Sequence, residues 1–105
     1  MESNFVQRKF TTQRDDSCIR VMQWNILCDS LSDAFDRVPK HLLQWEYREP
    51  LIIQHIQDLD ADVVCLEEVD KFNEIIGGLT NYDGKCVMKA DGVMGCALLW
   101  RKDRV

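Results

Sequence analysis

Two short apolar segments on either side of an amphipathic one constrain the fold of this chain most strongly. The first runs from Ile19 to Leu27 and the second from Val63 to Leu66. Both have the length of β-strands, and their apolar character predicts strands that are buried on both faces. With a helix between them, they predict the βαβ unit of a layered α/β fold.

The intervening helix is predicted to run from Trp45 to Leu59. Apolar residues recur here at spacings of three, four or seven, which places them on one helical face. Pro50 would interrupt a helix interior, but a start at Trp45 keeps it near the first turn, where backbone N–H groups have no partner within the helix. The apolar residues of this face are Leu42, Trp45, Ile52, Ile56 and Leu59.

The rest of the chain is assigned from turn signals and short apolar runs. We expect one partial domain over residues 18–105, preceded by a polar tail at 1–17, with no linker that would divide two domains. The expected elements are a loop with one short helical turn at 28–39, a short helix from Phe72 to Leu79 that Gly77 and Gly78 close, a turn at 81–84, a strand at 85–89 and a strand at 96–102.

Composition limits the function only weakly. The 105 residues carry a formal net charge of -5, which argues against a general electrostatic grip on nucleic acid. A nucleotide substrate remains open, because a divalent-cation site is itself rich in carboxylates. The sequence contains no apolar run long enough to cross a membrane and no recognisable secretory signal. We therefore expect a cytoplasmic protein without membrane partners.

The five cysteines contain no closely spaced zinc or redox pair. Their neighbours are apolar, so we expect small buried hydrophobic residues in a reducing compartment. Arg48, with Glu46 and Glu49, is predicted to form part of a solvated helix face. His41 and His55 are expected at the surface or at a helix end, and Trp24 is expected in the core.

Polar residues leave both apolar segments at their carboxyl ends. Asn25 follows the first segment, and Glu67, Glu68 and Asp70 follow the second. Such ends converge on one crevice in an α/β sheet, and an amide oxygen beside a carboxylate is a plausible partial shell for Mg²⁺. Successive strand residues point to opposite faces, so only one of Glu67 and Glu68 should serve the same ion. The ordinary alternative is a local backbone hydrogen bond for Asn25 and a solvated strand end.

Four segments in order, residues 19–27, 42–56, 62–72 and 95–104, resemble the endonuclease/exonuclease/phosphatase family. The resemblance is closest to its deadenylase branch, which contains nocturnin-like and carbon catabolite repressor-type poly(A) nucleases. It implies the amino-terminal part of a layered α/β sandwich, here truncated. It also implies that Asn25 and Glu68 are catalytic residues that bind Mg²⁺, and it makes Lys89 a candidate for contacting a substrate phosphate, against the alternative of a solvated lysine.

The function implied by the resemblance is Mg²⁺-dependent phosphoester hydrolysis, with the 3′ poly(A) tail of mRNA as substrate. The alternatives are a 2′-phosphatase acting on the adenine dinucleotide NADP(H), a 2′,5′-phosphodiesterase, or a non-catalytic binding module. Glu67 stands where the family usually has glutamine, Met94 where the branch usually has aspartate, and the segment between Asp70 and Gly95 is short. The family's catalytic histidine and Asp-x-Asn motifs have no counterpart, so we expect the chain alone to be inactive.

Overall fold

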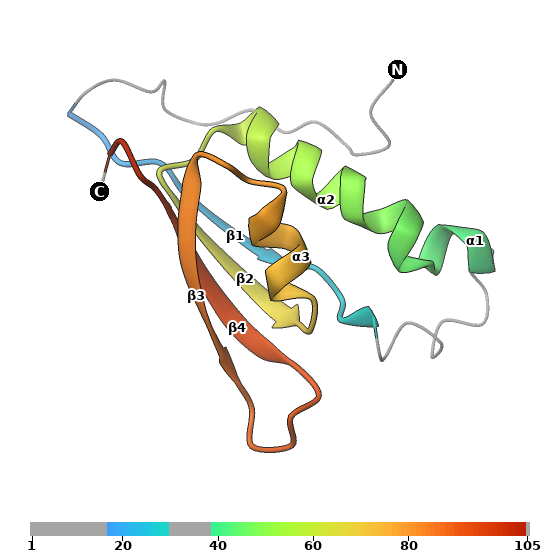
Figure 1. The fold of residues 1–105 in the computed structure, drawn as a ribbon. Helices are drawn as coiled ribbons and strands as arrows, with labels where there is room; N and C mark the ends of the chain where they lie inside the picture. The colour runs from blue at the N-terminus through green and yellow to red at the C-terminus, as the bar shows by residue number, and fades with distance from the viewer. Residues whose placement is uncertain (1–16, 30–38, 105) are drawn as a thin grey trace.

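The computed structural model describes residues 17–29 and 39–104, which form one four-stranded sheet with helices against it (Figure 1). The predicted α/β class is confirmed. The predicted tail and most of the predicted loop after the first strand lie outside the described residues. The strands are β1 (Val21–Asn25), β2 (Val63–Val69), β3 (Tyr82–Met88) and β4 (Gly95–Arg101), and the helices are α1 (Lys40–Leu43), α2 (Trp45–Leu59) and α3 (Phe72–Gly77).

The strand order is β1-β2-β4-β3. β1 and β2 are parallel and α2 connects them, as the βαβ prediction requires. β4 runs antiparallel to both β2 and β3. The carboxyl ends of β1 and β2 therefore lie side by side, with Asn25 opposite Glu67 in the register.

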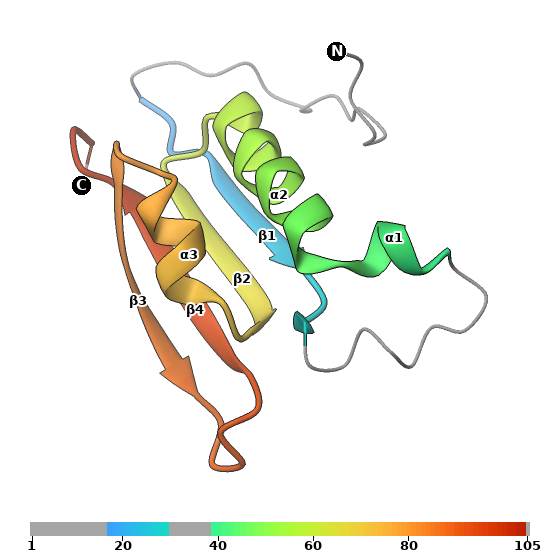
Figure 2. The same ribbon diagram turned by 45° about the vertical axis from the view of Figure 1, so that its right-hand side comes forward.

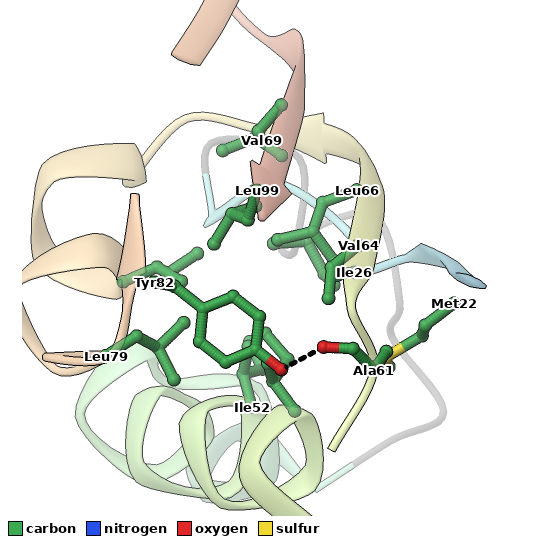
Figure 3. Close-up of a cluster of buried hydrophobic side chains, with 13 residues drawn as sticks. Met22, Ile26, Ile52, Ala61, Val64, Leu66, Val69, Leu79, Tyr82 and Leu99 are labelled. Atoms are coloured by element: carbon green, nitrogen blue, oxygen red, sulfur yellow. Dashed lines mark hydrogen bonds between the residues drawn. The ribbon is translucent and has the colours of Figure 1, made fainter. Parts of the chain in front are cut away.

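One face of the sheet carries the hydrophobic core. α2 and α3 both pack on this face, as the two views of Figures 1 and 2 show. Ile52 and Ile56 of α2 and Ile75 of α3 are buried in one cluster with the inward residues of the strands. Figure 3 shows part of this cluster, with Ile52 of α2 labelled. The core residues on the sheet and its connections are Met22, Ile26, Ala61, Val64, Leu66, Val69, Leu79, Tyr82, Ala97 and Leu99.

The other face of the sheet is uncovered in the part of the chain that the structure describes. Val21 is 59% exposed, Leu98 46% and Val87 68%, whereas Met22, which follows Val21 in β1 and points to the other face, is buried. The prediction of strands buried on both faces is therefore wrong. The sequence shows that a segment is apolar, but it does not show how many layers cover it.

α2 has the predicted bounds. It ends at Leu59, and the next residue, Asp60, caps it: Asp60 has a left-handed backbone (φ 49°), and its N–H donates to the carbonyls of Ile56 and Gln57. Pro50, however, is the sixth residue of the helix and lies beyond the first turn. Its missing N–H therefore leaves the carbonyl of Glu46 without the helical hydrogen bond from the residue four positions later. The sequence-based expectation had placed Pro50 near the first turn, where this bond would not be lost.

β3 begins earlier than expected. The turn predicted at 81–84 is wrong, because Tyr82 already pairs with Arg101 in the sheet. The Tyr82 side chain is buried, and its hydroxyl donates to the Ala61 carbonyl at 2.5 Å (Figure 3). Burial of this aromatic ring outweighs the local turn preference of its neighbours.

The cysteines are all free thiols, but only Cys28 is fully buried. Cys65 and Cys86 are half-buried, and Cys18 and Cys96 are exposed. Cys65 and Cys96 lie on the uncovered side of the sheet, whereas Cys86 packs against the edge of the core. The prediction of uniformly buried cysteines is thus wrong. None of the helices in the described ranges is long and apolar enough to span a bilayer.

His55 on α2 packs edge-on against Trp24 of β1, with their ring centroids 4.7 Å apart. Burial lowers the pKa of His55 below its ordinary value of 6.5, and the charge of Asp58 opposes this shift. The unfolded chain then binds a proton more readily than the folded chain does. We expect the free energy of unfolding to fall as the pH is lowered through 6.5 towards the pKa of the folded state.

Chemical denaturation of the parent chain and of His55→Gln at about pH 7.5 and about pH 5.5 measures this effect. The parent should lose more stability between the two pH values than His55→Gln loses. His41→Gln, at an exposed position on α1, is the control and should behave like the parent. Equal pH dependence in the parent and in His55→Gln would contradict the assignment.

Candidate metal and phosphoester site

A β-bulge in β2 shapes the site. Leu66 pairs with Ala97 and Val69 pairs with Gly95, so β2 spends three steps where β4 spends two. Leu66 and Val69 are both buried on the helix-covered side. The two glutamates between them consequently share the other side of the sheet, because the bulge interrupts the strict alternation of a strand.

Two side-chain contacts confirm this arrangement. The Gln23 amide donates to Glu67 Oε1 at 2.6 Å, and the Asn25 amide donates to Glu68 Oε2 at 2.5 Å. Gln23 and Asn25 are two residues apart in β1 and so point to the same face. The prediction that Glu67 and Glu68 point to opposite faces is therefore wrong, whereas the predicted approach of Asn25 to Glu68 is present.

The backbone is unusual on both sides of this contact. Glu68 has φ of 56° and Leu27 has φ of 60°, a left-handed conformation that is uncommon for side chains of this size. Such residues cost about 1–3 kcal/mol each and persist where the surrounding structure fixes them, often at functional sites. One partner of the Asn25–Glu68 contact is thus itself strained, and the other lies two residues before the strained Leu27.

Asn25 also makes the local bond expected from the ordinary alternative. Its Oδ1 accepts from the Leu27 N–H at 3.2 Å while its Nδ2 donates to Glu68. A half-turn of the amide about the Cβ–Cγ bond would place Oδ1 beside the Glu68 carboxylate. Two oxygen donors would then meet at one point, which fits a hard cation such as Mg²⁺.

The described residues contain no group of three or more His, Cys, Asp or Glu side chains that could hold a metal ion. An ion at this point would take only Asn25 and Glu68 from the described residues. Mg²⁺ tolerates such a partial shell because it keeps several positions for water and substrate phosphate. Asn25 is exposed and Glu68 is half-buried, so both remain accessible from solvent.

The other predicted residues lie elsewhere. Asp70 accepts from the Asp29 N–H at 3.0 Å, so it anchors the segment after β1. Lys89 follows β3, where its N–H donates to the Met94 carbonyl at 2.8 Å. Its exposed side chain has no hydrogen bond or ion pair with Asn25 or Glu68 in the described structure. Contact with a phosphate therefore stays a prediction for Lys89.

Arg48 is the residue that sequence reasoning misplaced. It is half-buried, and its Nη2 donates to the carbonyls of both Ile26 and Leu27 in the segment that follows β1. The prediction of a solvated helix face is wrong, because the local pattern of α2 does not reveal a partner 22 residues earlier in the chain. The sequence feature that could have indicated a buried Arg48 is Trp45, one helical turn before it. The guanidinium carbon of Arg48 lies 5.8 Å from the centroid of the Trp45 ring.

A cleft of about 340 Å³ adjoins Asn25 on the side of α2. Its wall combines apolar residues with the Arg48 guanidinium and the Tyr47 ring. The lining residues are Trp24, Asn25, Ile26, Leu27, Leu42, Tyr47, Arg48, Leu51 and Ile52. Asn25 thus borders a mainly apolar hollow, whereas Glu68 is not part of its lining.

Solved structures identify the class of this arrangement. An endonuclease/exonuclease/phosphatase from Bacteroides vulgatus matches 81% of the chain with a TM-score of 0.64 and 32% identity, and the chain covers 32% of it. ANGEL2, a 2′,3′-cyclic phosphatase, matches 81% with a TM-score of 0.73 and 28% identity, and the chain covers 27% of it. The chain is a partial α/β domain of the endonuclease/exonuclease/phosphatase fold.

Related sequences narrow the class further. Nocturnin of Drosophila melanogaster is 36% identical over 120 residues, which cover the whole chain and 19% of that protein. The 3′-5′-exoribonuclease subunit Ccr4 of Neurospora crassa is 45% identical over 53 residues, which cover 49% of the chain and 7% of Ccr4. No family model matches the chain. It belongs with the nocturnin- and Ccr4-like members of the fold, as an amino-terminal part, and it spans less than a third of these relatives.

Proposed function

We propose that this chain is part of a Mg²⁺-dependent phosphoester hydrolase that removes nucleotides from the 3′ poly(A) end of mRNA. The observation that carries the proposal is the contact between Asn25 and Glu68 at 2.5 Å, at the adjacent carboxyl ends of two parallel strands. The similarity to nocturnin and to an exoribonuclease subunit supports the nuclease reaction. We place the protein in the cytoplasm.

In this proposal, Asn25 and Glu68 would together hold the ion. The bound ion would offset the negative charge that develops on the phosphate during attack by water. Glu68 supplies the negative charge that binds the cation, and the Asn25 amide supplies a neutral oxygen. Neither side chain is placed as a general base, so in this proposal the base and the group that stabilises the leaving oxygen are residues other than Asn25 and Glu68.

A second candidate function is a phosphatase acting on a small adenosine phosphate, such as the 2′-phosphate of NADP(H). A structure of ANGEL2 holds adenosine-2′,3′-vanadate, and the chain resembles it with a TM-score of 0.72 and 30% identity. The cleft beside Asn25, with its aromatic and guanidinium groups, suits a single nucleotide better than a long strand. Adenine dinucleotides are therefore the competing substrate class.

The substrate test uses a longer protein that contains this chain together with the rest of the domain. With Mg²⁺, it should shorten a 5′-labelled oligo(A) one nucleotide at a time and leave oligo(C) largely intact. Phosphate release from NADPH without shortening of oligo(A) would establish the second candidate instead. Binding of either substrate without turnover would contradict both and indicate a binding module.

Chemistry at the site is tested in a chimaera in which residues 18–104 replace the aligned part of ANGEL2. We expect Mg²⁺-dependent cleavage of a 2′,3′-cyclic phosphate, because the fold and the two candidate ligands are kept. The 105-residue chain alone should show none. Turnover by the chain alone that Glu68→Ala abolishes would contradict our view that the remaining catalytic groups lie elsewhere.

A further inference from the structure

Arg48 links α2 to the segment directly after the candidate ligand Asn25. The guanidinium lies half-buried between the helix and the end of β1, and one nitrogen, Nη2, reaches two consecutive carbonyls, those of Ile26 and Leu27. Hydrogen bonds from a charged donor are among the stronger ones in proteins. Arg48 therefore restrains two successive peptide groups at one point.

The restrained peptides belong to the strained turn that orients Asn25. Leu27 is held at φ of 60°, and its N–H donates to Asn25 Oδ1 at 3.2 Å. On its other side, the Asn25 amide donates to Glu68. A chain of contacts thus runs from Arg48 through the Leu27 peptide to Asn25 and then to Glu68.

Among the described residues, the side-chain hydrogen bonds of the half-buried Arg48 go only to the carbonyls of Ile26 and Leu27. Its Nη1 is buried and has no hydrogen-bond partner in that part of the structure. Burial of a guanidinium with an unpaired nitrogen is unfavourable unless the remaining bonds compensate. The two carbonyl bonds are the compensation that the structure provides, together with the face of the Trp45 ring.

We propose that Arg48 is a positioning residue: it holds the peptide between Ile26 and Leu27 and so fixes the turn after β1, which sets the point from which the Asn25 side chain reaches Glu68 in either orientation of its amide. Its importance for catalysis rests on the proposed function, in which these two side chains hold the cation. Its effect on the Asn25 side chain does not depend on that function, because it acts in the metal-free chain as well.

The experiment compares the 105-residue chain with Arg48→Met, Arg48→Lys and Arg20→Met. Arg20 is the matched control, because its Nη1 donates to the Leu59 carbonyl at 2.9 Å, at the opposite end of β1. NMR relaxation gives the order parameter of the Asn25 side-chain amide without metal. Broadening of the Glu68 amide signal by Mn²⁺ gives the cation affinity, and thermal unfolding shows that each variant folds.

In Arg48→Met, the Asn25 order parameter should fall from about 0.85 to below about 0.6. Mn²⁺ affinity should fall about 10–100-fold, as for other residues that orient metal ligands. Arg48→Lys, which keeps one charged donor, should lie between Arg48→Met and the parent. Arg20→Met should leave both quantities at the parent values.

An unchanged order parameter in folded Arg48→Met would overturn the proposal, as would an equal loss in Arg20→Met. If Arg48→Met does not fold, Arg48→Lys decides by the same criterion. If the parent binds no Mn²⁺ at Glu68 but Asn25 still loses order in the Arg48 variant, the positioning role stands and the metal assignment fails. The two failures are thus distinguishable.

Discussion

Glu68→Ala in the ANGEL2 chimaera is expected to lower kcat by about 10²–10³-fold, the loss typical of removing one group that stabilises transition-state charge. The reason is that Glu68 supplies the only carboxylate in contact with Asn25 among the described residues. Raising the Mg²⁺ concentration should recover part of the activity, because the ion would still bind weakly to Asn25. Steady-state kinetics at several Mg²⁺ concentrations measures both effects.

Glu67→Ala is the matched control for this prediction. Glu67 is the neighbouring carboxylate on the same face of the sheet, but its side chain accepts a hydrogen bond from Gln23, whereas the Asn25 amide donates to Glu68. We expect kcat to change by less than about tenfold in Glu67→Ala, because the substitution removes a nearby negative charge but no proposed ligand of the ion. Equal losses in Glu67→Ala and Glu68→Ala would contradict the assignment of Glu68 as the ligand.

Gly95→Ala should destabilise the chain by about 3 kcal/mol or more, at the upper end of what overpacking costs. Gly95 pairs with Val69 at the end of the bulge and with Met88 of β3. A Cβ here would lie 2.2 Å from the Val87 carbonyl oxygen and 2.7 Å from the Met88 Cα. These atoms belong to the backbone of a paired strand, so they cannot move aside without breaking the ladder.

Urea unfolding of the parent and of two alanine variants measures this effect. Gly77→Ala is the control, because a Cβ at the end of α3 meets nothing within 4 Å. It should leave stability unchanged or raise it by up to about 1 kcal/mol, since alanine favours the helix. A Gly95→Ala chain within about 0.5 kcal/mol of the parent would show that β3 and β4 are not as closely packed here as the structure has them.

The spacing of apolar residues along the sequence was sufficient to predict α2, β1 and β2. The helical spacing of Trp45, Ile52 and Ile56 gave the bounds of α2, and the two apolar runs gave β1 and β2. Because these strands are parallel, their carboxyl ends had to meet, which brings Asn25 to the end of β2. The choice of Glu68 over Glu67 as its partner came from the family resemblance, and the structure has the Asn25–Glu68 contact.

What could not be predicted depends on contacts between distant parts of the chain. The bulge that brings Glu67 and Glu68 to one face arises from pairing with β4, about 30 residues later, and alternation within β2 does not reveal it. Arg48 looked solvated because its partners belong to the segment after β1. Tyr82 entered a strand because its ring is buried, although its neighbours favour a turn.

The uncovered sheet face follows the same logic. Val21, Leu98 and Val87 are apolar and exposed. The expectation of burial on both faces concerned residues 19–27 and 63–66, and for Val21 it identified the apolar character but not the exposure. In the described residues, helices cover only one face of the sheet (Figures 1 and 2). An apolar segment predicts burial, but the partner that buries it has to come from the tertiary structure.

A crystal structure of the chain with Mn²⁺, with the ion located by its anomalous scattering, tests the central claim most directly. We predict one ion between about 2.0 and 2.4 Å from both Asn25 Oδ1 and a carboxylate oxygen of Glu68, with the Asn25 amide turned from its metal-free orientation. An ion bound at Glu67 or Asp70, or an Asn25 amide that still donates to Glu68 at saturating Mn²⁺, would contradict the claim that these two side chains form one metal site.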